Sequence, residues 1–169
     1  AHDSIDSSLL VGIPRKLNRE AYDIDDEALP FIGFDVWNCY EVSYMLDNGY
    51  PVNCVAKIII PSSSPNIVES KSLKLYLNSY NMHKMGPDIE TSILNAQYTI
   101  EQHLSKTLGV KYVPIALFTD SLYNPGSVPM MGFTPIENLI NVELVEFNKF
   151  NEDEDILKPM KVNMGVPLQ

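Results

Sequence analysis

Residues 68–80 read Val-Glu-Ser-Lys-Ser-Leu-Lys-Leu-Tyr-Leu-Asn-Ser-Tyr, and this stretch decides which kind of fold the chain can adopt. Its apolar side chains recur at the spacing i, i+3, i+4 and i+7, which places them on one face of a helix. The stripe consists of Leu73, Tyr76, Leu77 and Tyr80. The sequence therefore predicts an amphipathic helix from about Ser70 to Tyr80, packed by that face against another layer.

Polar groups crowd the start of this helix, where a carboxylate, two hydroxyls and two ammonium groups fall within residues 69–74. The cluster permits two interpretations. In the first, Glu69 accepts two N–H donors from the planar edge of a ligand. The free backbone amides of the first turn then hold an anion, together with Ser70, Lys71 and Lys74. In the second, the stretch is a capped amphipathic helix with solvated lysines.

Upstream, two sets of side chains alternate along residues 34–46, which is typical of a strand. One set is Val36, Asn38, Tyr40, Val42, Tyr44 and Leu46, and the other is Asp35, Trp37, Cys39, Glu41, Ser43 and Met45. Asp47-Asn48-Gly49 marks a turn, since Asn-Gly suits positive φ. A second strand is predicted at residues 52–60, so the two strands form a long hairpin.

Downstream, a second helix is predicted to begin near Pro87-Asp88, with the proline in its first turn and the aspartate beside its positive end. Gly109 is expected to end this helix. Its apolar stripe consists of Ile89, Ile93, Ala96, Ile100 and Leu104. Two further strands are predicted at residues 112–118 and 140–147.

The predicted order is therefore two strands, two helices and two strands, which favours an α+β fold. We expect an antiparallel four-stranded sheet with two helices on one face (ββααββ). Residues 1–33 are predicted to form an irregular N-terminal strap and residues 34–150 the folded module. Residues 151–169 are predicted to form an acidic linker or tail, because residues 152–155 are four successive carboxylates.

The net charge and the composition limit the kinds of partner and site that the protein can have. The net charge of −10 disfavours direct contact with nucleic acid, because an acidic surface repels a phosphate backbone. No apolar run approaches membrane-spanning length and no signal-peptide pattern opens the sequence, so a cytoplasmic protein without a membrane partner is expected. The cysteines and histidines have no zinc-binding spacing, so no metal site is predicted. Cys39 and Cys54 lie in neighbouring predicted strands; a disulfide is conceivable, but free buried thiols are favoured.

Four motifs, in their order and spacing, resemble a known family. They are SLLVGIPRKLNRE at 8–20, LPFIGFDVWNCYEVSYML at 29–46, GYPVNCVAKIIIP at 49–61 and SPNIVESKSLKLYLNSYN at 64–81. The chain resembles the amino-terminal half of the two-module form of NADPH-dependent 7-cyano-7-deazaguanine reductase, the nitrile reductase of queuosine biosynthesis, a tRNA modification pathway. The resemblance implies the tunnelling fold, in which modules join through their sheet edges and ligand sites lie between modules.

The resemblance also assigns roles to the start of the first helix. It implies that Glu69 holds the edge of 7-cyano-7-deazaguanine through charge-assisted hydrogen bonds, while the backbone around Val68 and Ser70 shapes the pocket. Ser70 and Lys71 are expected to face NADPH.

Other residues near the motif are weaker candidates. Ser72 and Lys74 can contact ligand, but a helix cap and a surface charge explain them equally well. Trp37 and Tyr40 invite a stacking role, although a tryptophan on a strand more often belongs to the core. Asn78 can bond substrate or simply face solvent.

The catalytic groups of a complete enzyme are not found in this sequence. In the family, a cysteine thiolate adds to the nitrile, and hydrides from two NADPH molecules complete the reduction to an amine. Where one-module relatives carry that cysteine and the acidic proton donor, this chain has Met45 and Val52. Cys39 and Cys54 do not fit the motif, and the expected His-Glu pair is missing. No catalytic residue is therefore predicted in this chain.

A second tunnelling-fold module is the expected partner, in the same full-length chain or in another copy, and a homo-oligomer is expected. That module would supply the catalytic cysteine. The rival hypothesis is a non-catalytic deazapurine-binding or assembly module that kept the fold and lost the chemistry.

Overall fold

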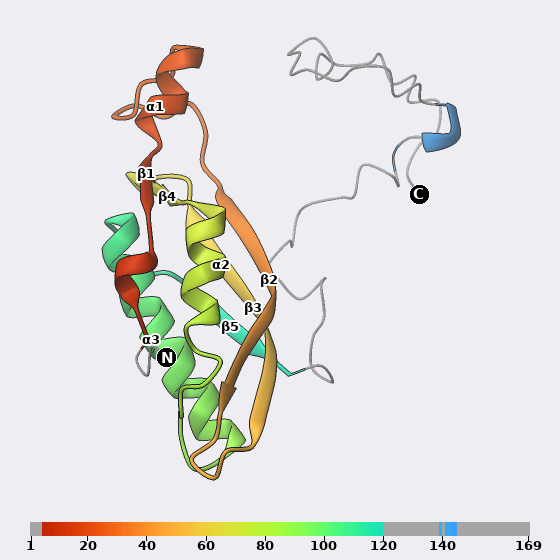
Figure 1. The fold of residues 1–169 in the computed structure, drawn as a ribbon. Helices are drawn as coiled ribbons and strands as arrows, with labels where there is room; N and C mark the ends of the chain where they lie inside the picture. The colour runs from red at the N-terminus through yellow and green to blue at the C-terminus, as the bar shows by residue number, and fades with distance from the viewer. Residues whose placement is uncertain (1–4, 120–138, 140, 145–169) are drawn as a thin grey trace. The chain divides into compact units, whose positions relative to one another are not determined.

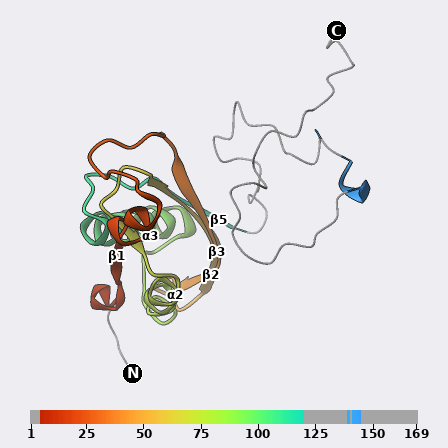
Figure 2. The same ribbon diagram turned by 90° about the horizontal axis from the view of Figure 1, so that it is seen from above.

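The computed structural model describes residues 5–119, 139 and 141–144. The chain divides into two compact units, Ala1–Val128 and Pro129–Gln169, and each is considered by itself. The first unit contains a three-stranded antiparallel sheet of β2 (Phe34–Met45), β3 (Pro51–Pro61) and β5 (Ile115–Phe118), in the order β2-β3-β5. Helices α2 (Ser70–Asn78) and α3 (Ile89–Leu108) both lie on one face of this sheet (Figures 1 and 2). The described part of the chain is therefore α+β, as predicted.

The hairpin of β2 and β3 confirms the predicted turn, with Gly49 at φ +87°. It also contains a β-bulge that the alternation does not predict. Cys39 pairs with Ala56 but Val42 pairs with Cys54, so two residues of β2 stand opposite one residue of β3.

The bulge changes the face on which the β2 side chains point. Beyond it, Val42 and Tyr44 are buried in the core, as the alternation predicts. Before it, Trp37 and Cys39 pack against that same core, although the alternation places them in the opposite set. The prediction of one strict alternation along the strand is therefore wrong, because one extra residue reverses the phase.

The core lies between the sheet and the two helices. All four residues of the predicted stripe on α2 are buried, although the helix ends at Asn78, two residues early. On α3 the predicted stripe is buried from Ala96 onward, while Ile89 is 46% exposed. Pro87 precedes the N-cap Asp88 instead of occupying the first turn, and Gly109 ends the helix at φ +72° as predicted. The buried residues of the two helices are Ser72, Leu73, Tyr76, Leu77, Ser92, Ala96, Ile100, Leu104, Ser105 and Leu108.

A polar network joins the two helices inside this core. The Tyr76 hydroxyl lies 2.6 Å from the Tyr80 hydroxyl and 2.8 Å from Nδ1 of His103 on α3. The Tyr76 ring meets the Tyr80 ring edge to face, with ring centroids 5.4 Å apart. Burial is the main reason why the pKa of His103 falls below its usual value of 6.5, with the positive charge of Lys106 acting in the same direction. The folded protein therefore favours the neutral imidazole.

The N-terminal segment contains short regular elements. The strand β1 (Gly12–Pro14) pairs antiparallel with β4 (Asn66–Val68), the strand that leads into α2. Around β1 lie a 3₁₀ turn at Ser7–Leu9, the short helix α1 (Lys16–Arg19) and a 3₁₀ turn at Glu20–Tyr22. Arg15 ties this segment to the sheet through an ion pair with Asp35 and a 3.0 Å hydrogen bond to Ser64 Oγ.

The fourth predicted strand, at residues 140–147, is not confirmed. Val142–Leu144 form a single 3₁₀ turn instead of a strand, and residues 140 and 145–147 lie outside the described residues. The predicted acidic tail at 151–169 also lies outside them, and the predicted boundaries after residues 33 and 150 stay predictions. Among the described residues, no helix is long and apolar enough to cross a membrane.

Gly109→Ala should lower the free energy of unfolding by about 1–2 kcal/mol, because a side chain at positive φ is strained. The added Cβ would also lie 2.8 Å from Cγ of Pro65. Urea denaturation measures the change. Gly33→Ala is the matched control, since nothing lies within 4 Å of its Cβ position, and it should change stability by less than about 0.5 kcal/mol. Equal effects of the two substitutions would contradict the assigned cap.

His103 should make stability depend on pH. The pKa of His103 is lower in the folded state than its usual value of 6.5. As the pH falls below 6.5, the unfolded chain therefore binds more protons than the folded chain does. Stability should therefore be fully present above pH 6.5 and decline as pH falls through the folded pKa. NMR titration of the imidazole should give a pKa below 6.5, and His103→Gln should flatten the decline. An unchanged slope in the variant would show that His103 is not its source.

Candidate functional site

The start of α2 is organised around Glu69, the N-cap residue, which has extended backbone angles (φ −73°, ψ 132°). Its carboxylate accepts the backbone N–H of Lys71 at 2.9 Å and that of Ser72 at 2.6 Å. These two hydrogen bonds are the main reason why the pKa of Glu69 is lowered. The carboxylate is therefore ionised and held in one orientation at the positive end of the helix.

The capped-helix interpretation of the motif is thus present in the structure. It does not exclude the ligand-binding interpretation, because a carboxylate offers about four lone-pair positions and the cap uses two. The cap does change how an anion would be held. The amides of Lys71 and Ser72 already donate to Glu69, so an anion here depends on side chains more than on free amides.

The structure places the other predicted residues around this cap. Val68 is buried at the end of β4, whereas Ser70 and Lys71 are exposed. The Ser70 hydroxyl lies 3.4 Å from Oε1 of Glu69. Ser72 is 5% exposed and faces the interior, so it does not offer its hydroxyl to solvent.

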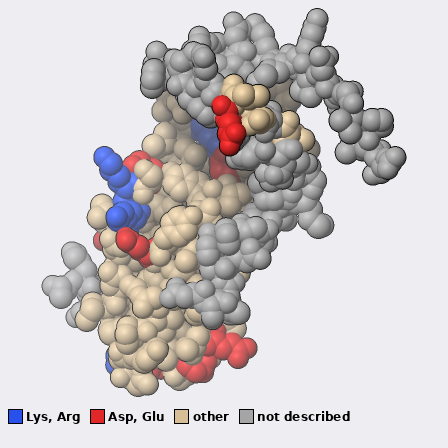
Figure 3. All heavy atoms as spheres, turned by 90° about the vertical axis from the view of Figure 1, so that its right-hand side faces the viewer, with Lys and Arg blue, Asp and Glu red and all other residues tan. Residues whose placement is uncertain are grey.

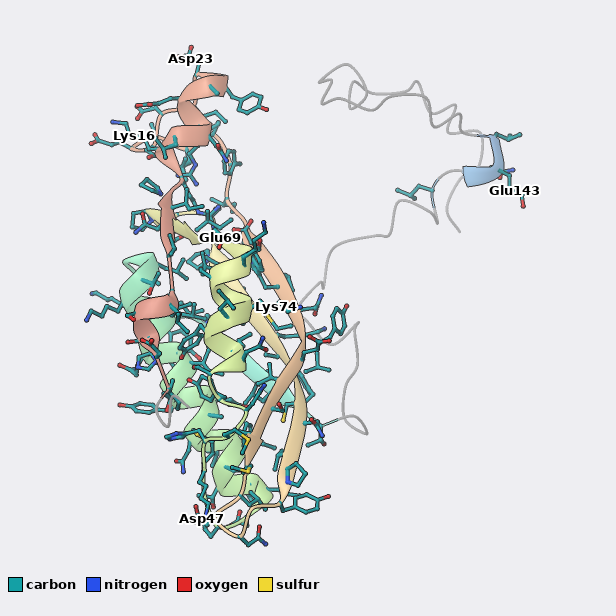
Figure 4. The ribbon with its side chains drawn as sticks, in the orientation of Figure 1. Lys16, Asp23, Asp47, Glu69, Lys74 and Glu143 are labelled. Atoms are coloured by element: carbon teal, nitrogen blue, oxygen red, sulfur yellow. The ribbon has the colours of Figure 1, made fainter. Side chains whose placement is uncertain are left out.

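A pocket of about 380 Å³ opens between α2 and the edge strand β2. Ser70 and Lys74 line it from the helix, but Val68, Glu69 and Lys71 do not. Lys74 Nζ lies 3.7 Å from a Glu41 carboxylate oxygen, which links the two walls. Figure 4 shows Lys74 farther along α2 than Glu69. The full lining is Trp37, Asn38, Cys39, Tyr40, Glu41, Ser70, Leu73, Lys74 and Leu77.

The composition of this pocket suits a planar ring. Two leucines provide an apolar floor, two aromatic rings stand on the strand, and a few polar groups are present. Trp37 both packs on the core, as predicted for a strand tryptophan, and lines the pocket, while its stacking role stays a prediction. Figure 3 shows the side of the molecule that lies at the right in Figure 1, where basic side chains lie beside acidic ones. Asn38 and Glu41 were not predicted as site residues, because the alternation places them on opposite faces of a regular strand and does not reveal the bulge beside them.

Neither cysteine has the environment of a nucleophile. Neither forms a disulfide, which agrees with the favoured prediction, although Cys39 is only partly buried. Burial raises the pKa of the Cys39 thiol to about 11, so it is protonated at neutral pH. Cys54 is buried, with its sulfur 3.8 Å from the Tyr44 hydroxyl. Within the described residues, no group of three or more His, Cys, Asp or Glu side chains could hold a metal ion.

Met45 and Val52 belong to the scaffold of the hairpin end. The Met45 amide donates to the His83 carbonyl at 2.9 Å, and the Met45 carbonyl accepts the Met85 amide at 2.9 Å. Val52 is 4% exposed, in the core. Figure 4 shows the hairpin turn at Asp47 at one end of the first unit, with the cap at Glu69 well away from it, at the start of α2.

Comparison with known proteins gives consistent matches. Residues 2–116 match the family described as "Nitrile reductase, 7-cyano-7-deazaguanine-reductase N-term". The protein named NADPH-dependent 7-cyano-7-deazaguanine reductase of Rickettsia prowazekii (strain Madrid E) is 37% identical over 156 residues, covering 92% of this chain and 53% of that protein. The protein of the same name from Chromohalobacter salexigens is 36% identical over 155 residues, covering 83% of this chain and 54% of its own length.

The chain thus spans about half the length of the curated relatives it matches. The resemblance carried by the four sequence motifs is confirmed, since the matched residues include all of them. By this match, the chain belongs to the family of amino-terminal modules of 7-cyano-7-deazaguanine nitrile reductases.

Proposed function

We propose that this chain is the amino-terminal half of a nitrile reductase that converts 7-cyano-7-deazaguanine to 7-aminomethyl-7-deazaguanine in queuosine biosynthesis, using two NADPH. Its part is to supply the Glu-Ser-Lys-Ser motif at the start of α2, while the catalytic cysteine lies in another module. The observation that carries the proposal is the Glu69 carboxylate, which two backbone amides hold ionised and oriented with lone pairs to spare.

Substrate binding is assigned to Val68, Glu69 and Ser70. The deazaguanine edge presents parallel N–H donors, and an oriented carboxylate accepts such donors at little further entropic cost. Buried Val68 supports the backbone beside the carboxylate. The pocket that begins at Ser70 offers a ring-sized concavity with aromatic side chains next to this contact.

NADPH binding is assigned to Ser70 and Lys71, both of which are exposed. Because Glu69 occupies two first-turn amides, an NADPH phosphate would meet the Ser70 hydroxyl and the Lys71 ammonium group. A hydroxyl and a mobile cation are groups that bind phosphate in proteins, so the exposed residues fit this part of the cofactor. When bound, NADPH supplies hydride.

The partner in this proposal is a second tunnelling-fold module, from the same full-length chain or from another copy, in a cytoplasmic homo-oligomer. The protonated Cys39 and buried Cys54 support the placement of the catalytic thiol in that module. The strand β2 is an edge of the described sheet and borders the pocket, so a second module could complete both. The complete four-stranded sheet belongs to this proposal.

Glu69→Ala should weaken binding of 7-cyano-7-deazaguanine to the full-length protein by on the order of 30- to 1000-fold, because paired N–H donors lose a charged acceptor. NADPH binding should change much less. Lys71→Ala should weaken NADPH binding more than binding of 7-cyano-7-deazaguanine. This loss of affinity should be smaller at high salt, as expected for a phosphate contact. Isothermal titration calorimetry with each ligand measures both affinities.

Asp88→Ala is the control for loss of a helix cap. Asp88 caps α3 through the Thr91 amide at 2.8 Å, yet it does not line the pocket beside α2. It should therefore leave both affinities within about twofold of wild type. If Glu69→Ala and Lys71→Ala also leave both affinities unchanged, the motif is only a capped helix start and the site assignment is wrong.

The 169-residue chain alone should not reduce the nitrile, because neither of its thiols is activated. Oxidation of NADPH, followed by absorbance in the presence and absence of 7-cyano-7-deazaguanine, measures this. Nitrile-dependent oxidation of NADPH that persists after replacement of both Cys39 and Cys54 would contradict the proposal that the catalytic thiol lies in another module. Activity of the full-length protein would separate the reductase from the rival, a non-catalytic deazapurine-binding or assembly module.

A further inference from the structure

The N-terminal segment is hydrogen-bonded directly to the first turn of α2. The Val11 carbonyl accepts the Glu69 amide at 2.9 Å, and the Val11 amide donates to the Ser72 hydroxyl at 3.1 Å. The next residue, Gly12, pairs with Val68 in the two-stranded sheet of β1 and β4. One short segment of backbone therefore contacts the cap residue, the residue before it and the residue three positions after it.

Ser72 joins these contacts to the cap. Its hydroxyl accepts from Val11 and donates to the Glu69 carbonyl at 2.8 Å, while its amide donates to the Glu69 carboxylate. The residue is 5% exposed, so water competes little for these groups. Removing the hydroxyl would leave the hydrogen bond from the Ser72 amide to the carboxylate in place but remove the link between the Val11 amide and the Glu69 carbonyl.

The other side of this segment rests on the end of α3. A Cβ on Gly12 would lie 2.8 Å from the Thr107 carbonyl oxygen, so backbone meets backbone there with no room for a side chain. The same carbonyl accepts a hydrogen bond from the Asn66 side chain at 3.2 Å. Ser72 therefore connects the first turn of α2 to a segment whose backbone packs closely against the end of α3.

We propose that Ser72 is a positioning residue: by clamping the N-terminal segment to Glu69, it holds the carboxylate and Ser70 in the geometry that binds the deazaguanine edge. This inference rests on the proposed function and adds a role for a residue that does not touch ligand. A hydrogen-bonded contact of this kind limits rotation of the first turn, and a carboxylate must hold its angle to accept two parallel donors.

The chain offers a matched control on the same helix face. The Ser79 hydroxyl accepts the Asp6 amide at 3.3 Å and donates to the Tyr76 carbonyl at 2.6 Å. Ser79 thus makes the same pair of bonds, one to the N-terminal segment and one to the carbonyl three residues earlier. It does so at the C-terminal end of α2, away from Glu69.

The test compares Ser72→Ala, Ser72→Thr and Ser79→Ala in the full-length protein. Ser72→Ala removes both hydrogen bonds of the hydroxyl but no ligand contact. It should raise both the dissociation constant and the KM for 7-cyano-7-deazaguanine by roughly 2- to 10-fold, which corresponds to about the net free energy of one hydrogen bond. Its kcat should stay within about twofold of wild type, because the thiol lies in another module. Ser72→Thr keeps the hydroxyl and should recover most of the affinity. Ser79→Ala should lower the melting temperature comparably without changing KM.

Gly12→Ala is a second way to displace the segment without touching Ser72, and it keeps the test valid if Ser72→Thr does not fold. It should also raise KM, because its Cβ meets the Thr107 carbonyl. The inference is overturned if Ser72→Ala and Gly12→Ala bind 7-cyano-7-deazaguanine like wild type while Glu69→Ala does not. It is also overturned if Ser79→Ala raises KM as much as Ser72→Ala. If Glu69→Ala itself binds normally, the proposed function fails instead.

Discussion

The first turn of α2 has backbone N–H groups without helical partners, and most of the site follows from how they are satisfied. Glu69 accepts two of them, which fixes its own carboxylate and lowers its pKa. Ser72 then connects the cap to the N-terminal segment. The first turn of α2 is thus joined to β1, which lies more than fifty residues earlier in the chain than β4 and α2.

The two interpretations of the Glu-Ser-Lys-Ser motif prove compatible. A capping carboxylate is preorganised, because the backbone holds it without help from a ligand, and its remaining lone pairs stay open to a donor pair. The same cap reduces the number of free amides for an anion. Phosphate binding in the proposed function therefore depends on the side chains of Ser70 and Lys71. The same helix end would then bind a hydrogen-bond donor, the deazaguanine edge, through Glu69 and a hydrogen-bond acceptor, the phosphate, through Ser70 and Lys71.

The bulge in β2 shapes the pocket that lies beside the cap. Without it, the side chains before and after residue 40 would keep one phase, and Trp37 would face away from the core that holds Val42. With it, Trp37 and Cys39 turn toward α2, and the bulged Tyr40 and Glu41 stand at the rim of the pocket. Glu41 then lies within reach of Lys74. One extra residue in an edge strand thus shapes the wall of the pocket that faces α2.

By itself, the sequence determined the two helices, the hairpin and the family, but not the short elements β1, α1 and β4, and its fourth predicted strand is not confirmed. The spacing of apolar residues predicted both helices and the hairpin strands, and Asn-Gly and Gly109 marked the ends of elements, because each depends on interactions within a few residues. The four motifs also identified the family, which the comparisons confirm. The tertiary structure decided the phase change at the bulge, the burial of Ser72 under Val11 and the pairing of Glu41 with Lys74. These depend on strand register and on contacts between residues far apart in the chain, and no local pattern encodes the distance between such partners.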